Sequence, residues 1–136
     1  MLINRAYELD SDFNSGALDD FLLLFYASVP ESMYVRDLKD MGKKMEKAEI
    51  HFQRALEKSK GLLAGPYVSY ASAVCIPAQD YASFKKMLDA ALAIDPDADP
   101  GNRLVNKLTQ QKAQHLLDSA IYFFITFGEE DELDVW

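Results

Sequence analysis

The sequence predicts an all-α protein, and two observations support that fold class. Apolar residues recur at the three-to-four-residue spacing of an amphipathic helix, most clearly over residues 43–58 and 80–94. No segment alternates apolar and polar residues for long enough to form a half-buried strand. We therefore expect a single helical-repeat domain over residues 1–136, with an acidic tail at residues 128–136.

The N-terminal part contains two expected helices. Residues 2–9 resemble the end of a helix, because their apolar side chains fall near one face, and the polar stretch "DSDFNSG" then breaks it. Residues 17–29 form an apolar helix with Asp19 and Asp20 in the first turn, where acidic side chains suit the helix dipole. A proline ends this helix, and residues 30–43 are irregular.

Four more helices follow, and residues that favour helix ends separate them. Gly61 fits a helix end, and Pro66 fits the first position of the next helix. Pro77 forces the residue before it out of the helical region, and Asp80 can cap the following helix. The expected helices cover residues 43–58, 66–76, 80–94 and 102–127.

Three alternating aspartates in "AIDPDADPGNR" (93–103) raise the alternatives of a calcium loop and an acidic turn. Counted from Asp95, the sixth position is Pro100 and the twelfth is Asn106, where an EF-hand loop needs glycine and glutamate. The acidic turn is the better prediction, with Asp95 as a cap and Pro96 ending the preceding helix. We expect no metal site and no cofactor.

Composition limits the classes of function. Nearly half of the residues (49%) are hydrophobic, which is enough for a packed core and excludes a disordered chain. The 22 acidic and 14 basic residues give a net charge of −8, and an acidic surface repels phosphate backbones, so no nucleic-acid partner is expected. Cys75 is the only cysteine and lies in a small apolar run, which favours a buried structural thiol.

A divergent internal repeat accompanies the helical pattern. The aligned alanines Ala6, Ala55 and Ala91 are 49 and 36 residues apart, and the insertion at 30–43 explains the longer interval. These intervals compare with about 34 residues in a tetratricopeptide repeat. Such helix pairs cannot bury their own apolar faces, so they must stack as a short solenoid. Two copies share an interval of four residues followed by one of three, and each set contains one phenylalanine. The first set is Ala48, Phe52 and Ala55, and the second is Phe84, Leu88 and Ala91.

Several motifs resemble one known family. They are "GPYVSYA" (65–71), Pro-x-Gln-Asp at 77–80, "AIDPDADP" (93–100) and Asn-Arg-Leu-x-Asn at 102–106. With "FNSGALDDFLLLFYASVP" before them, they resemble the tetratricopeptide-like T component associated with tripartite ATP-independent periplasmic (TRAP) transporters. The resemblance covers residues 1–127.

The resemblance implies a non-catalytic helical solenoid that is exported, lipid-anchored and works beside a periplasmic substrate-binding protein. It also implies a homo-oligomer, a trimer in at least one member, and a possible small-molecule ligand. The chain has no counterpart of the family's signal, lipobox cysteine and first helices, so we expect it to match the C-terminal part of the architecture. The expected location is the periplasm, or the cytoplasm if the chain is complete. The stretch "QQKAQHLL" (110–117) departs from the family pattern at Lys112, Gln114 and His115.

Five residues are candidates for binding a ligand or partner. Tyr67, Ser69 and Tyr70 combine apolar bodies with polar tips, which suits a groove between helix pairs, although ordinary interhelical packing explains the same spacing. Arg103 and Asn106 lie one turn apart, and Arg103 could bind a carboxylate of a ligand or partner. Arg103 could equally bridge to the acidic turn.

No catalytic group of residues stands out. The two histidines, His51 and His115, are far apart in sequence, and no nucleophile motif or glycine-rich phosphate loop is present. The sequence therefore predicts a protein that is not an enzyme. Two functions remain: a TRAP-associated solenoid, and a generic tetratricopeptide-type adaptor that captures peptides. Adaptors that hold acidic tails use basic grooves, to which a chain of net charge −8 is poorly suited.

Overall fold

The computed structural model describes residues 2–11, 13, 16–28 and 44–125, and within these ranges it is all-helical and has no strand. The first helices are α1 (Leu2–Leu9), α2 (Ala17–Ser28) and α3 (Lys44–Lys58). The chain continues through α4 (Gly65–Tyr70), a π-helical turn η4 (Ala71–Cys75) and α5 (Tyr81–Ala93). Two 3₁₀ turns, η5 (Pro96–Ala98) and η6 (Pro100–Asn102), lead into α6 (Arg103–Asp118) and a last turn η7 (Ala120–Tyr122).

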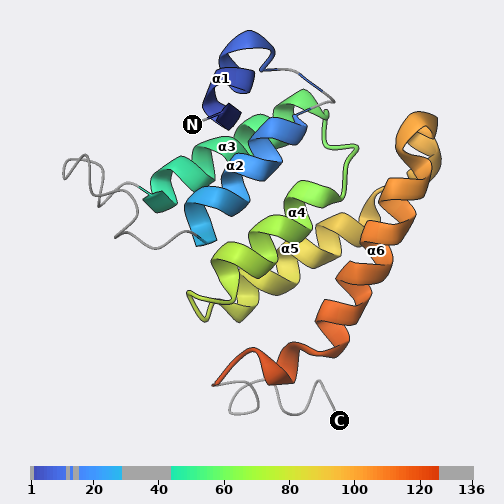
Figure 1. The fold of residues 1–136 in the computed structure, drawn as a ribbon. Helices are drawn as coiled ribbons and strands as arrows, with labels where there is room; N and C mark the ends of the chain where they lie inside the picture. The colour runs from blue at the N-terminus through green and yellow to red at the C-terminus, as the bar shows by residue number, and fades with distance from the viewer. Residues whose placement is uncertain (1, 12, 14–15, 29–43, 126–136) are drawn as a thin grey trace.

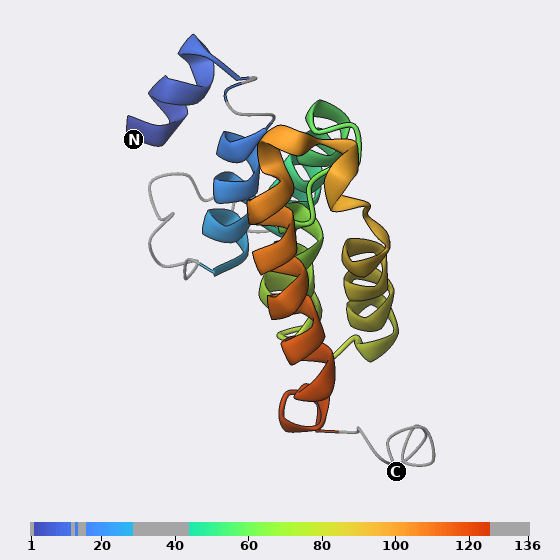
Figure 2. The same ribbon diagram turned by 90° about the vertical axis from the view of Figure 1, so that its right-hand side faces the viewer.

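The helices pack in pairs. Helices α2 and α3 lie side by side and antiparallel, and α4 with η4 forms a second antiparallel pair with α5 (Figure 1). Helix α6 packs on α4 and α5 and runs along the second pair, as the turned view shows (Figure 2). Helix α1 lies beside the end of the first pair. The expected insertion at residues 30–43 and the acidic tail at 128–136 lie outside the described residues.

The positions of the predicted repeat point inward in both pairs. Ala48, Phe52 and Ala55 are at most 3% exposed, and the equivalent positions on α5 are fully buried. The small alanines let neighbouring helices approach closely, while the aromatic rings fill the space between them. The third aligned alanine, Ala6 on α1, is exposed. The equivalent α5 residues are Phe84, Leu88 and Ala91.

Two buried clusters form the core, and α4 joins them. The smaller cluster consists of Leu23, Ala48 and Phe52, between α2 and α3. Tyr67 and Tyr70 on α4 pack against both clusters, so the second helix pair shares its apolar surface with the first. The larger cluster consists of Ala64, Val68, Ala71, Cys75, Phe84, Leu88, Ala91, Ala113, Ala120 and Phe124.

Several predicted helix ends are confirmed, but Pro77 does not force Ile76 out of the helical region, because Ile76 keeps right-handed helical angles of φ −64° and ψ −52°. Asp80 caps α5 by accepting a hydrogen bond from the Ser83 backbone at 3.1 Å, and Asp95 accepts one from the Asp97 backbone at 2.9 Å. Gly61, with φ +68°, takes the left-handed conformation just beyond the end of α3. The expected thiol environment is also confirmed, because Cys75 is 2% exposed and burial raises its pKa to about 12.

The prediction that the last helix extends to residue 127 is wrong beyond Asp118, where α6 ends. The chain turns at η7 so that Phe124 packs edge-on against Phe84, with ring centroids 4.9 Å apart. The Gln79 side chain holds this turn, since it donates to the Phe123 carbonyl at 2.9 Å and accepts from the Ile125 backbone at 2.8 Å. Burial of an aromatic side chain and these two bonds outweigh continued helix propensity.

Candidate functional site

Tyr67 and Tyr70 lie where α4 faces α3. The Phe52 ring contacts both, with centroids 6.1 Å from Tyr67 and 4.4 Å from Tyr70. Burial, together with a hydrogen bond to Glu49, raises the pKa of Tyr70 well above its usual range. These contacts are those of interhelical packing, one of the two alternatives that the sequence left open. Whether either ring also contacts a ligand stays a prediction.

Asn106 fastens α6 to the loop before α4. Its side-chain Oδ1 accepts a hydrogen bond from the Ala64 backbone at 2.9 Å, and its Nδ2 donates to the Leu62 carbonyl at 2.8 Å. The residue is fully buried, so these two bonds satisfy an amide that would otherwise be costly to bury. Because the two bonds flank Leu63, Asn106 fixes that residue relative to α6.

Arg103 pairs with the acidic turn. Its Nε lies 2.7 Å from Asp97 Oδ1, and both side chains are more than half exposed. An exposed pair of this kind adds little stability, and its guanidinium remains accessible to a partner. The bridge to the turn is thus present, and binding of an external carboxylate stays a prediction.

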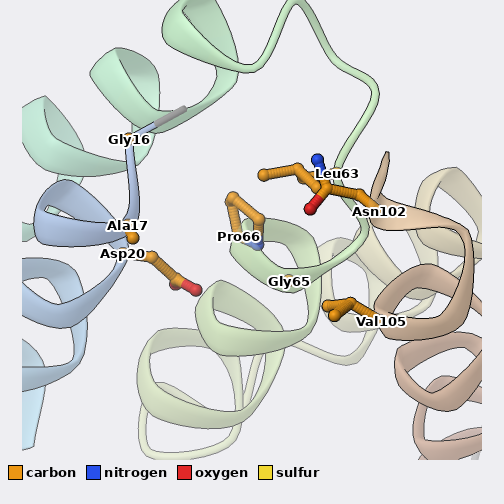
Figure 3. Close-up of a pocket in the computed structure, with 8 residues that line it drawn as sticks. All are labelled: Gly16, Ala17, Asp20, Leu63, Gly65, Pro66, Asn102 and Val105. Carbon is orange, nitrogen blue, oxygen red and sulfur yellow. The ribbon is translucent and has the colours of Figure 1, made fainter. Parts of the chain in front are cut away.

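A pocket lies between the beginnings of α2, α4 and α6 (Figure 3). Its volume is about 160 Å³, and Leu63, fixed by Asn106, forms part of its wall. Its apolar surface comes from leucine, proline, valine and alanine, and its polar side chains are one aspartate and one asparagine. The lining residues include no serine, cysteine or histidine. The lining residues are Gly16, Ala17, Asp20, Leu63, Gly65, Pro66, Asn102 and Val105.

Asp20 is the charged group of this pocket. Its Oδ1 is buried and has no hydrogen-bond partner within the described structure. Burial raises the pKa of Asp20 above its usual value, while a hydrogen bond from the Ser69 hydroxyl and the charge of Lys112 lower it. Gly65 leaves room for this carboxylate, because a Cβ at residue 65 would lie 3.2 Å from Asp20 Oδ2. The carboxylate is therefore held in place but incompletely hydrogen-bonded.

The sequence predicted Ser69 as a binding residue but assigned Asp20 only to the helix dipole. Ser69 reaches the pocket through its bond to Asp20. No local sequence signal identifies Asp20 as a pocket residue, because the pocket forms where α4 and α6 approach α2.

A second polar cluster on the other side of α2 has complete pairing. Asp19 is fully buried, and its carboxylate receives the Lys58 ammonium at 2.6 Å and the His51 ring Nδ1 at 2.7 Å. Lys58 also donates to the Ser11 carbonyl at 2.6 Å and to the Tyr7 hydroxyl at 3.2 Å. The cluster therefore ties α1 and its following loop to α2 and α3.

Two negative findings concern only the described residues. Within residues 2–11, 13, 16–28 and 44–125, no three His, Cys, Asp or Glu side chains lie close enough to hold a metal ion. No helix in the part of the chain that the structure describes is long and apolar enough to cross a membrane.

The chain is similar to known proteins over almost its whole length. The model of the family described as "TRAP transporter T-component" matches residues 1–124. An uncharacterized protein of Treponema pallidum (strain Nichols) is 35% identical over 125 residues, which are 92% of this chain and 36% of that protein. The chain thus spans about a third of the length of this relative.

Proposed function

We propose a function from the fact that the chain belongs to the TRAP transporter T-component family. It is a non-catalytic helical component of a TRAP-type solute uptake system. In that system it binds the periplasmic substrate-binding protein. The match over residues 1–124 is the observation that supports this function most strongly. A pocket with a carboxylate and apolar walls is compatible with a binding role. The family implies that the protein works in the periplasm, anchored to the membrane.

The proposed architecture is a stack of divergent tetratricopeptide-like hairpins forming one domain over residues 1–136. Support comes from the equivalent burial of Phe52 on α3 and Leu88 on α5, with the buried Ala55 and Ala91 at matching positions. Exposure of Ala6 is consistent with a further helix packing on α1 in the longer family architecture. The antiparallel pairs of Figure 1 are the hairpins of this stack.

The outer face of α6 is the surface that we assign to the substrate-binding protein. Leu104, Val105 and Leu108 are 70%, 55% and 56% exposed and lie within about one turn of each other. A cluster of exposed leucine and valine at the N-terminal end of one helix is typical of an interaction site. Arg103 at the same end would pair with a carboxylate at the rim of that interface.

The small-molecule part of the proposal concerns the pocket beside this face. Ser69 would hold the Asp20 carboxylate, and Asn106 would keep the Leu63 wall in place. Tyr67 and Tyr70 would fix the position of α4 against α3. In this role the four residues position other parts of the pocket and do not themselves contact the ligand.

The test is size-exclusion chromatography with light scattering, on the chain alone and mixed with the cognate substrate-binding protein. We expect a mixed species at micromolar concentration, and the mass of the chain alone gives its own oligomeric state, a trimer if it follows the family. Leu108→Asp should abolish the mixed species, because a charge would be buried at the centre of the interface. Leu9→Asp on α1, where Leu9 is 71% exposed, is the matched control and should leave it intact.

The alternative function is a generic tetratricopeptide-type adaptor that captures peptides. Its support is the antiparallel helix pairing, and the net charge of −8 counts against acidic peptide tails. Absence of a mixed species with the substrate-binding protein, together with binding of a peptide, would favour this alternative.

A further inference from the structure

We infer that the pocket between α2, α4 and α6 binds a small aliphatic primary amine, whose ammonium group pairs with Asp20 and whose hydrocarbon part contacts Pro66 and Val105 (Figure 3). The inference rests on the small-molecule part of the proposed function, which names no ligand class.

The incomplete pairing of Asp20 calls for a hydrogen-bond donor. Its Oδ1 is buried and without a partner in the described structure, although a buried carboxylate oxygen is normally hydrogen-bonded. Asp20 lines the pocket, so a donor bound there lies next to this carboxylate. An ammonium group supplies three donors and a compensating charge, so it satisfies this carboxylate more fully than water or a hydroxyl does.

The rest of the lining sets the size and polarity of the ligand. Leu63, Pro66 and Val105 give an apolar surface, and the volume of about 160 Å³ admits only a small molecule. A cavity of about 150 Å³ lined by apolar side chains is enough to hold benzene, so a branched chain of five or so carbon atoms fits here. The Asn102 side chain already donates to Asp99 Oδ2 at 2.8 Å, which leaves Asp20 as the charged group that selects the ligand.

Charge selects against acids at this site. A ligand carboxylate would meet Asp20 at short range, and like charges in a partly buried site repel strongly. Burial raises the pKa of Asp20, and the charge of Lys112 acts in the opposite direction and lowers it. The pocket therefore discriminates an amine from an acid of the same shape.

The test is isothermal titration calorimetry of the chain with 3-methylbutylamine, without the substrate-binding protein. The comparators are 4-methylpentanoate, which has the opposite charge, and trimethyl(3-methylbutyl)ammonium, which keeps the charge but lacks N–H donors. We expect the amine to bind and the acid not to bind. The trimethylated cation should bind at least about tenfold more weakly, because it cannot donate a hydrogen bond to the Asp20 carboxylate.

Two variants with matched controls locate the site. Asp20→Asn should weaken amine binding at least about tenfold, while Asp118→Asn at the far end of α6 should not change it. Val105→Trp should fill the pocket and remove binding, whereas Leu104→Trp, next to it but outside the lining, should not. Circular dichroism confirms that each variant is folded.

Three results would overturn the inference: no heat with the amine at millimolar concentration, equal binding of amine and acid, or unchanged amine binding by Asp20→Asn. None of these depends on the substrate-binding protein. Loss of the mixed species in chromatography with intact amine binding would instead contradict the proposed partner alone.

Discussion

Asp19 and Asp20 are neighbours on α2, yet they lie in regions with opposite electrostatic designs. Asp19 faces α3, is fully buried, and receives an ammonium at 2.6 Å and an imidazole at 2.7 Å. Asp20 faces α4 and α6, lines a pocket, and has one buried oxygen without a partner. The two carboxylates differ by about 100° around the helix axis, which is enough to place them in different interfaces.

The difference indicates that the Asp19 interface stabilises the fold and that the Asp20 interface is available to bind a ligand. On the Asp19 side the charge is compensated, so that side closes the contact between α1, α2 and α3. On the Asp20 side, burial raises the pKa of the Asp20 carboxyl, and one of its oxygens has no hydrogen-bond partner in the described structure. This burial costs folding free energy and leaves a carboxylate that can bind a ligand. Perturbed titratable groups in a pocket are typical of functional sites.

The largest effect is expected when the Asp19 side loses its cation. Lys58→Met keeps most of the side-chain volume and leaves His51 as the ring partner of Asp19 among the described residues. The free energy of unfolding should fall by about 3 kcal/mol, because an uncompensated buried charge remains. Urea denaturation followed by circular dichroism measures this change.

Lys85→Met is the matched control, since Lys85 pairs with Asp89 on the surface of α5, where both side chains are more than half exposed. It should change the stability by no more than about 0.5 kcal/mol. Similar losses in the two variants would mean that the Asp19 cluster is no more important than a surface pair.

A smaller loss of stability is expected when Leu63, in the wall of the Asp20 pocket, is no longer held by the Asn106 side chain. Asn106→Leu keeps the branched shape of the side chain but leaves the Ala64 N–H and the Leu62 carbonyl without the side-chain partner shown here. The free energy of unfolding should fall by about 2 kcal/mol, the cost of leaving buried polar groups unpaired. Binding of 3-methylbutylamine should weaken as well, because Leu63 is no longer fixed.

The exposed Gln114, which bonds Asp118 on the same helix at 2.9 Å, provides the control for this change. Gln114→Leu should alter stability by less than about 0.5 kcal/mol. An Asn106→Leu variant as stable as the native chain would show that the two bonds do not hold the wall.

The sequence predicted the helices well because their ends have local causes. The cap at Asp80 and the glycine at residue 61 act on the backbone next to them. The end of α6 was missed because its cause is distant in sequence. Phe124 packs on Phe84, and Gln79 bonds the backbone of the turn from more than forty residues away.

The candidate site could be predicted only in part for the same reason. The packing face of Tyr67 follows from helical spacing, and the bridge of Arg103 follows from nearby acidic residues. The pocket at Asp20 depends on where α4 and α6 approach α2, which no local pattern contains. The role of Asn106 is likewise tertiary, since its partners lie 42 and 44 residues earlier in the chain.

The smallest effect concerns Asp20 itself and has the opposite sign. Because the pKa of Asp20 is raised in the folded chain, the folded state binds more protons than the unfolded state between the ordinary carboxyl pKa of 3.8 and the raised pKa. The contribution of Asp20 to stability is therefore fully present below pH 3.8 and is lost as the pH rises through the folded pKa. Asp20→Asn removes this dependence and should stabilise the chain by about 1 kcal/mol at pH 7, since an unpaired buried charge is replaced by a neutral amide.

Urea denaturation of the native chain and of Asp20→Asn across the acidic range measures this effect, with Asp118→Asn as the exposed control. The stability difference between Asp20→Asn and the native chain should grow with pH and then level off above the folded pKa. A difference that is independent of pH would mean that Asp20 titrates as it does in the unfolded chain. The pocket side of α2 would then be no more strained than the paired Asp19 side.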